Sequence, residues 1–271
     1  MSTTTPPGRF AAVSALTPVG QGRWRAHVEP GWDIAGNVNG GVLLALAARA
    51  MSAATGRPDP VTITGHYLAP VSHGPIDIAT EVIRRGRTLA TASATLERDG
   101  TPLVQALGTL GEVDAQADTL LADGGPPDLP PVEACVPIDP TDGFPPPFMG
   151  KVELRLHPAD AGFFDGAKAG EARMRGWFRL RDGEPIDSAA LVMAVDAFPP
   201  TIFNVDLPVA WVPTVELTAH VRARPAPGWL RCEFRTRFVS GGRLEADGLV
   251  WDEPGTLVAQ SRQLALVPRP R

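Results

Sequence analysis

An internal repeat constrains the fold of this chain more than any other feature of its sequence. The segment ITGHYLAPVSHG (63–74) aligns with LTAHVRARPAPG (217–228), which places Thr64 over Thr218. Later turns and strand-like runs keep nearly the same offset. A single repeat of this length predicts two related subdomains within one chain rather than a solenoid, which stacks many short units.

Each half has the pattern of two strands, one helix and four strands. In the first half, turn residues separate apolar runs that predict strands within 10–28, a helix over 40–54, and strands at 61–68, 76–84, 88–98 and 103–113. In the second half the same reasoning predicts strands at 152–157 and 172–181, a helix over 188–197, and strands at 214–223, 230–239, 243–251 and 256–267. The expected fold class is therefore α+β, with antiparallel sheets.

The composition predicts where the two halves separate. Residues 114–150 hold proline clusters and several aspartates but no Lys or Arg, which is typical of a linker. We therefore expect an N-terminal subdomain at 10–113 and a C-terminal subdomain at 151–267, preceded by a frayed tail at 1–9. The two helices are apolar almost all round, which predicts that each lies centrally against its sheet.

Composition also excludes several functions. A net charge of −5 argues against nucleic-acid binding, and no apolar run reaches the roughly 18 residues that a membrane span needs. The N-terminus has no apolar signal-peptide core, so a cytoplasmic location is expected. Two cysteines and five histidines without ligand-like spacing predict no metal site. The sequence lacks a G-x-S-x-G motif and a phosphate-binding glycine loop.

Asp196 is the first candidate for chemistry. It follows an apolar run and falls in the last turn of the predicted helix at 188–197. A carboxylate there is disfavoured by burial and by the partial negative charge of a helix C-terminus, so its presence suggests a function. The alternative is an aspartate at a helix end that reaches water.

Two further positions carry polar groups into apolar surroundings. Gln263 shares a strand face with small and apolar residues, so it is either a structural amide or one that orients a water. Asn39, Gly40 and Gly41 precede or open the first helix, with Asn39 as its N-cap. Free backbone N–H groups at a helix N-terminus attract an anion or a developing oxyanion, and glycines permit close approach. The alternative is a glycine-rich turn with a capping asparagine.

The runs NGGVLLALAARA and HYLAPVSHGPIDIATEVIRRGRTLATASATLERDG resemble the double-hotdog acyl-CoA thioesterases, the thioesterase II group. In the second half, WFRLRDGEPIDSAALVMAVDAFPP and LVAQSRQLAL carry the same resemblance. The resemblance implies that each half wraps a curved sheet around a helix, and that the two tandem halves form a pseudo-dimer.

The resemblance also implies an activity and its residues. It implies that a fatty acyl-CoA thioester is hydrolysed, without a cofactor, by a water that Asp196, Thr214 and Gln263 hold, with Asn39, Gly40 and Gly41 at the oxyanion. Strand periodicity instead places Thr214 on a solvated face. Phe234 and Phe238 beside the apolar helices predict a tunnel for the acyl chain. Exposed strand edges predict a homo-oligomer.

Two alternatives remain open at this point. One is a hotdog hydratase or dehydratase, although neither predicted helix contains the histidine that such enzymes pair with a carboxylate. The other is a protein that binds acyl-CoA without catalysis, which needs the pocket but not the carboxylate.

Overall fold

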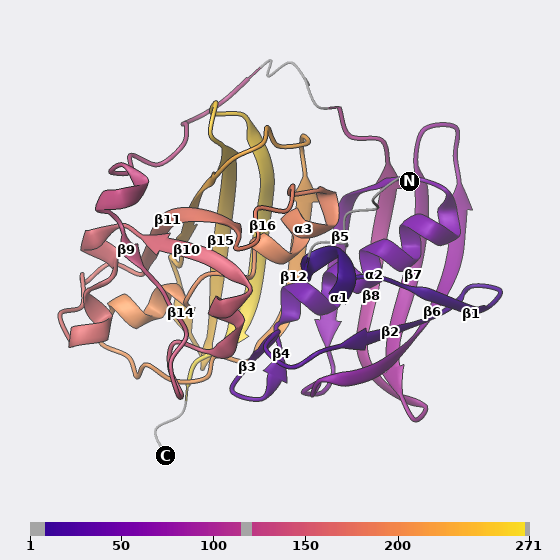
Figure 1. The fold of residues 1–271 in the computed structure, drawn as a ribbon, viewed down its shortest axis with the longest axis horizontal. Coiled ribbons are helices and arrows are strands. Elements are labelled where there is room, and N and C mark those ends of the chain that lie inside the picture. Colours follow the sequence, from indigo (N-terminus) through magenta and orange to yellow (C-terminus); the bar gives the residue numbers. More distant parts are fainter. Residues whose placement is uncertain (1–8, 115–120, 269–271) are drawn as a thin grey trace, which may run out of the picture.

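The computed structural model describes residues 9–114 and 121–268, and antiparallel strands dominate it (Figure 1). The first half contributes β1 (Thr17–Gly20), β2 (Arg23–Val28), β3 (Asp33–Ile34), β4 (Asn37–Val38), β5 (Asp59–Tyr67), β6 (Gly74–Arg85), β7 (Ala90–Arg98) and β8 (Thr101–Gly111). The second half contributes β9 (Val136–Pro137), β10 (Val152–Leu156), β11 (Arg173–Leu180), β12 (Thr214–Val221), β13 (Leu230–Arg235), β14 (Val239–Ser240), β15 (Arg243–Asp252) and β16 (Leu257–Leu266). All of these except the β3–β4 hairpin join one 14-stranded sheet.

The helices are few and short, apart from one. They are α1 (Arg9–Val13), α2 (Gly40–Thr55) and α3 (Ser188–Ala194), with 3₁₀ turns η1 (Val132–Ala134), η2 (Pro147–Gly150), η3 (Pro158–Asp160), η4 (Gly162–Asp165) and η5 (Thr201–Asn204). Among the described residues, no helix is long and apolar enough to span a bilayer.

Six strands follow a corresponding order in the two halves, and the second half adds β9 at its edge. Outward from the centre the order is β5-β8-β7-β6-β2-β1 on one side and β12-β16-β15-β13-β11-β10-β9 on the other. The halves join where β5 pairs antiparallel with β12, and there Thr64 lies opposite Thr218, with their hydroxyl oxygens 2.8 Å apart. Because these two threonines are equivalent in the sequence repeat, the same surface of each half meets itself, as in a two-fold symmetric dimer.

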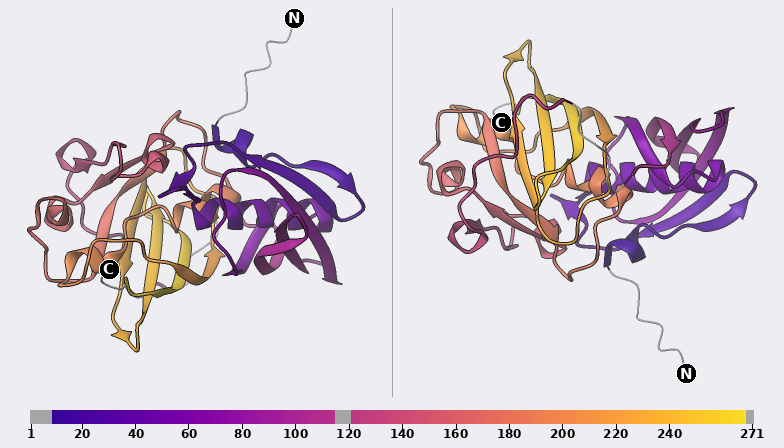
Figure 2. Two further views of the ribbon diagram at one scale, coloured as in Figure 1. Left: turned by 90° about the horizontal axis from the view of Figure 1, so that it is seen from below. Right: turned by 90° about the horizontal axis from the view of Figure 1, so that it is seen from above.

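The two central helices build the core. Every α2 residue from Gly41 to Ala48 is buried, and so is every residue of α3. α2 packs on β5, β6, β7 and β8 and also on α3, and Figure 2 shows it against one face of the first-half strands. Burial of such continuous apolar surface is the main source of stability in this arrangement. The central placement predicted for both helices is therefore confirmed.

The predicted elements agree with the structure except at several ends. The helix expected over 40–54 is α2, with Asn39 as N-cap and Gly56 as a left-handed C-cap at φ 70°. The strands expected from residue 61 onward are all present, with ends shifted by a few residues. The helix expected over 188–197 stops at Ala194, so Asp196 lies outside α3.

The secondary structure predicted from sequence for the N-terminal region is wrong. α1 contains Arg9, which was expected in the tail, and residues 10–13, which were expected to be strand. The rest of the expected tail, 1–8, lies outside the described residues. The backbone N–H groups of Phe10 and Ala11 donate to the Glu184 carboxylate at 2.9 and 3.0 Å. A contact with a residue so distant in sequence caps α1, and no local pattern predicts it.

Two other expectations need correction. β13 ends at Arg235, so Phe238 leaves the sheet and is 72% exposed instead of lining a tunnel. The segment 114–150 is not a plain linker over its described part, because β9 pairs with β10 and the side chains of Ile138, Phe148 and Met149 are buried. Residues 115–120 lie outside the described structure, and the subdomain boundaries stay a prediction.

Candidate functional site

The carboxylate of Asp196 lies between the two halves of the chain. Oδ2 accepts hydrogen bonds from the Gly41 backbone N–H at 2.8 Å and from Asn39 Nδ2 at 3.1 Å. Asn39 Nδ2 also donates to the Asp196 backbone oxygen at 2.9 Å. Asp196 therefore meets the N-terminus of α2 rather than the C-terminus of its own helix. The helix dipole favours the negative charge here, which reverses the expectation from sequence.

Close packing requires a glycine at Gly41 and leaves little room for a side chain at Gly40. A Cβ at Gly41 would lie 2.7 Å from the Met193 backbone oxygen and 3.0 Å from Asp196 Cβ. A Cβ at Gly40 would lie 3.0 Å from Asp196 Oδ2. These glycines were predicted to permit the close approach of an anion or a developing oxyanion, and in the structure the end of α3 and the Asp196 carboxylate approach them closely.

Thr214 and Gln263 complete a chain of hydrogen bonds to Asp196. Gln263 Nε2 donates to Asp196 Oδ1 at 3.1 Å and to Thr214 Oγ1 at 2.6 Å. Periodicity put Thr214 on the solvated face with Glu216, and that prediction is wrong. The β12–β16 register shifts between Thr214 and Glu216, and such a bulge turns Thr214 toward Gln263.

Tyr67 is a site residue that the sequence analysis missed. Its hydroxyl donates to the Gly40 carbonyl oxygen at 2.8 Å and so holds the first turn of α2. Burial, followed by the charges of Asp196 and Glu216, raises the pKa of Tyr67 well above 10, which keeps the phenol protonated. One signal was available, because Tyr67 is the only tyrosine in the chain and its counterpart in the repeat is Val221.

The surroundings of Asp196 bring the pKa of its carboxyl group close to neutral pH. Burial raises the pKa of Asp196 from 3.8 to about 6, against the opposing effect of hydrogen bonds from Gly41, Asn39 and Gly40. A carboxylate with this pKa is mostly ionised at pH 7 and still accepts a proton readily, which suits a general base.

These groups open into a cavity of about 580 Å³ between the halves. Its polar wall includes Asn39, Gly40, Tyr67, Asp196, Thr214 and Gln263, with Asn37 and Thr201 further along the lining. The remaining lining is mostly apolar and comes from the β3–β4 hairpin, the end of β5, residues 138–149, the loop after α3 and β13. The cavity therefore joins one reactive carboxylate to an extensive apolar surface, the general form of a small-molecule site.

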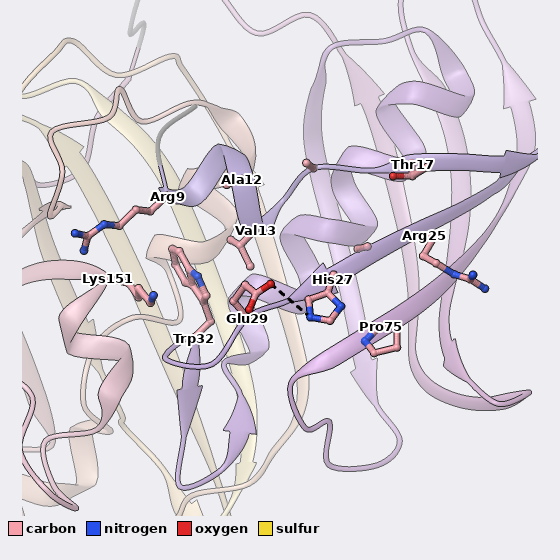
Figure 3. A pocket seen from close by; sticks show the side chains of 12 residues that line it. Arg9, Ala12, Val13, Thr17, Arg25, His27, Glu29, Trp32, Pro75 and Lys151 are labelled. Carbon is pink, nitrogen blue, oxygen red and sulfur yellow. Dashed lines mark ion pairs between the residues drawn. The ribbon is translucent and has the colours of Figure 1, made fainter. Parts of the chain in front are cut away.

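A second hollow, of about 610 Å³, lies under α1 and beside β2, where Lys151 reaches it from the second half (Figure 3). Two pairs of its ionisable side chains are in contact, since His27 lies 3.5 Å from Glu29 and Arg25 pairs with Asp77 at 2.6 Å. None of the residues around Asp196 lines this hollow. Within the described residues, no cluster of three or more His, Cys, Asp or Glu could hold a metal ion.

Comparisons with known proteins agree over both halves. A model of the acyl-CoA thioesterase N-terminal domain matches residues 28–111, and one of the C-terminal domain matches residues 132–267. An uncharacterized protein of Mycobacterium tuberculosis is 30% identical over 258 residues, which cover 88% of each chain.

Solved structures give the same result. A Thermobifida fusca protein assigned to thioesterase II is 33% identical and superposes with a TM-score of 0.89 over 98% of this chain and 99% of that chain. A hot dog fold protein of unknown function from Alicyclobacillus acidocaldarius, 23% identical, has a TM-score of 0.83 over 98% and 100%. An acyl-CoA thioesterase II from Mycobacterium marinum, 18% identical, has a TM-score of 0.70 over 96% and 98%. The last two likenesses show the hot dog fold. The two matched domain ranges include every residue of the polar wall.

Proposed function

Because the chain belongs to the acyl-CoA thioesterase family, we propose that it hydrolyses an acyl-CoA to a free acid and coenzyme A at Asp196. The acyl group is uncharged and apolar, as in a fatty acyl-CoA, and the reaction uses no cofactor. Subdomains 10–113 and 151–267 form a double-hotdog pseudo-dimer, connected by 114–150. The common strand order and the Thr64–Thr218 contact support this arrangement.

The observation that carries the proposal is the set of donors around Asp196. Gly41 and Asn39 occupy Oδ2, and Gln263 fixes the direction of Oδ1. A carboxylate held in this way loses little conformational freedom when a substrate binds, so it is already positioned to accept a proton. Thr214 Oγ1 accepts from Gln263 and keeps its own proton for a further bond.

In the proposed reaction, Asp196, Thr214 and Gln263 hold a water beside the thioester. Asp196 takes a proton from this water while the water oxygen bonds to the carbonyl carbon of the thioester. The tetrahedral intermediate then collapses, the C–S bond breaks, and the proton passes from Asp196 to the departing thiolate. Asp196 is ionised again at the end of the cycle.

The N-terminus of α2 serves this reaction electrostatically. Asn39, Gly40 and Gly41 bring the positive end of the α2 dipole to the place where negative charge develops on the substrate oxygen. Because Gly41 N–H donates to Asp196, the same turn also holds the base. Asp196 belongs to one half and Gly41 to the other, so neither half alone contains this site.

The two alternatives are less well supported. A hotdog hydratase pairs a histidine with its carboxylate, and the described residues of the cavity wall include no histidine. An acyl-CoA binding protein without activity needs no ionised carboxylate, and it leaves the cluster of donors on Asp196 without a use.

The test is release of free thiol from a series of acyl-CoA esters by the wild type and by Asp196→Asn. We expect Asp196→Asn to lower kcat by about 10²–10⁴-fold, because the shape is kept but the base is lost. Gln263→Ala should cost less, since the amide orients and transfers no proton. Equal kcat values would remove Asp196 from the mechanism, and tight binding without hydrolysis by the wild type would favour the binding protein.

A further inference from the structure

We propose that the cavity selects acyl groups that carry an aromatic ring over unbranched chains with the same number of carbon atoms. The proposal rests on the thioesterase activity proposed above and specifies its substrate class. It follows from the charge and the ring content of the cavity wall.

The charge of the wall excludes acidic acyl groups. Among the described residues that line the cavity there is no Lys, Arg or His, and Asp196 is the one ionisable carboxylate. A second carboxylate, as in a glutaryl group, would therefore be desolvated beside a like charge and without a cation, which costs free energy twice. The acyl group that fits is uncharged.

The wall is unusually rich in rings. The chain has 10 Phe, 6 Trp and one Tyr, and seven of these residues line this cavity. They are Tyr67, Phe144, Phe164, Phe198, Phe203, Trp211 and Phe234. An aliphatic lining would bury a linear chain equally well, so the concentration of rings points to a guest that interacts with rings specifically.

Packing fixes several of these rings in place. Phe198 and Phe234 lie with centroids 4.9 Å apart at 38°, and Gly248 opposite Phe234 has no side chain to displace its ring. On another part of the wall, Phe144 contacts Phe203 edge to face at 6.1 Å. The cavity therefore presents ring faces and edges that are already in position, so binding does not have to immobilise these side chains.

A ring on the substrate gains from this wall in two ways. Aromatic pairs in offset or edge-to-face contact gain stability beyond the burial of their area. A phenyl group also has fewer rotatable bonds to immobilise than an alkyl chain with the same number of carbons. Together these effects predict a preference of about 3- to 10-fold for the aryl substrate.

The experiment compares kcat/KM for 3-phenylpropanoyl-CoA and nonanoyl-CoA, which have equal numbers of acyl carbons. The ratio is measured for the wild type, for Phe198→Leu and Phe144→Leu in the wall, and for Phe238→Leu as control. Phe238 is 72% exposed and does not line the cavity. We expect a wild-type ratio of about 3–10, a ratio near 1 in at least one wall variant, and an unchanged ratio in the control.

The result can overturn either proposal separately. Hydrolysis of both esters with a wild-type ratio of 1 or less, or a ratio unchanged in both wall variants, would overturn the aryl preference and leave the thioesterase intact. If the wild type hydrolyses neither ester, the thioesterase proposal fails. Selection is then read from the dissociation constants of the S-(3-phenylpropyl) and S-nonyl thioethers of coenzyme A, and equal constants would overturn it.

Discussion

At the scale of single residues, the hydrogen-bond donors on Asp196 are all uncharged. Among the described residues, no Lys or Arg forms an ion pair with it. Neutral donors stabilise an ionised carboxylate less than a cation does, so the effect of burial dominates and the pKa rises to about 6. The site thus holds its carboxylate firmly in position without making it too weak a base.

Activity should therefore titrate with Asp196. The base works only when it is deprotonated, so kcat/KM should be half-maximal near pH 6 and should fall about tenfold per pH unit below that. The measurement is kcat/KM from pH 4.5 to 8, because this parameter reports the free enzyme. A flat profile across pH 5–7 would contradict the assignment.

The same raised pKa has a consequence for stability. Between the unfolded pKa of 3.8 and the folded pKa of about 6, the native state binds more protons than the unfolded state, so the stability contributed by Asp196 falls as pH rises through this window. Asp196→Asn removes this penalty and keeps an acceptor for Gly41 and Asn39. We expect urea unfolding to show a gain of roughly 1–3 kcal/mol at pH 7 and a smaller one at pH 4.5. A loss of stability at pH 7 would show that the charge is net favourable.

At the scale of elements, the end of α3 decides where the site lies. Sequence periodicity predicted the two central helices, most strands and the Asn39 cap, because these depend on local residue preferences. It extended the second helix past Ala194, because an apolar run does not reveal where a helix stops. It also misplaced Thr214, because a bulge changes which face a residue occupies without changing the pattern of residues. Asp196 and Gln263 were found because each breaks a local apolar pattern.

The approach of α3 to α2 depends on Gly41. Gly41→Ala would place a Cβ 2.7 Å from the Met193 backbone oxygen, and backbone there cannot move as a flexible side chain does. The overpacking should cost roughly 1–3 kcal/mol, which exceeds the gain of up to about 1 kcal/mol from the better helix propensity of alanine. We also expect at least a tenfold loss of kcat, because Asp196 is displaced. Gly125→Ala is the matched control, since nothing lies within 4 Å of a Cβ there; equal stability of the two variants would contradict this account.

At the scale of the whole molecule, the edges of the large sheet are protected. The edge strand β1 contains Pro18, and β9, at the other edge, is two residues long and contains Pro137. Short edges with proline resist pairing with another chain. The homo-oligomer predicted from sequence is still a prediction, but strand edges are not the surfaces that the structure favours for it.

Light scattering tests both the predicted association and whether the strand edges take part in it. We expect a mass above the 28.6 kDa of one chain at micromolar concentration. Val19→Lys places a charge on the exposed strand β1 and should leave this mass unchanged. A monomeric wild type would refute association, and dissociation of the variant would restore the role of the edge strand.

We expect the duplicated architecture to leave one site per chain. The N-cap equivalent to Asn39 is Asp187, which caps α3 and pairs with Arg49 at 2.6 Å, so the second helix N-terminus is already occupied by an ion pair. The positions equivalent to Asp196, Thr214 and Gln263 in the first half are Ala48, Pro60 and Gly108.

Both halves have the bulge at equivalent positions, but the residues there differ. β5 shifts register against β8 between Pro60 and Thr62, at the positions equivalent to Thr214 and Glu216. α2 has 16 residues against 7 in α3, so α2 continues through the place where Asp196 leaves its helix, and Ala48 there is 1% exposed. The two halves therefore share their backbone arrangement, but one has the Asp196 carboxylate at this position and the other has the buried side chain of Ala48.

Titration calorimetry should therefore give one molecule of a thioether analogue of acyl-CoA bound per chain. Asp196→Asn should keep this stoichiometry, because the carboxylate acts mainly in the transition state and binding depends on the apolar wall. Two equal sites per chain would mean that the second helix N-terminus also accepts ligand despite the Arg49–Asp187 pair. Arg49→Ala distinguishes the two accounts. It removes the partner of Asp187 without touching the cavity beside Asp196, so one site should persist with unchanged affinity if the duplication has kept a single working centre.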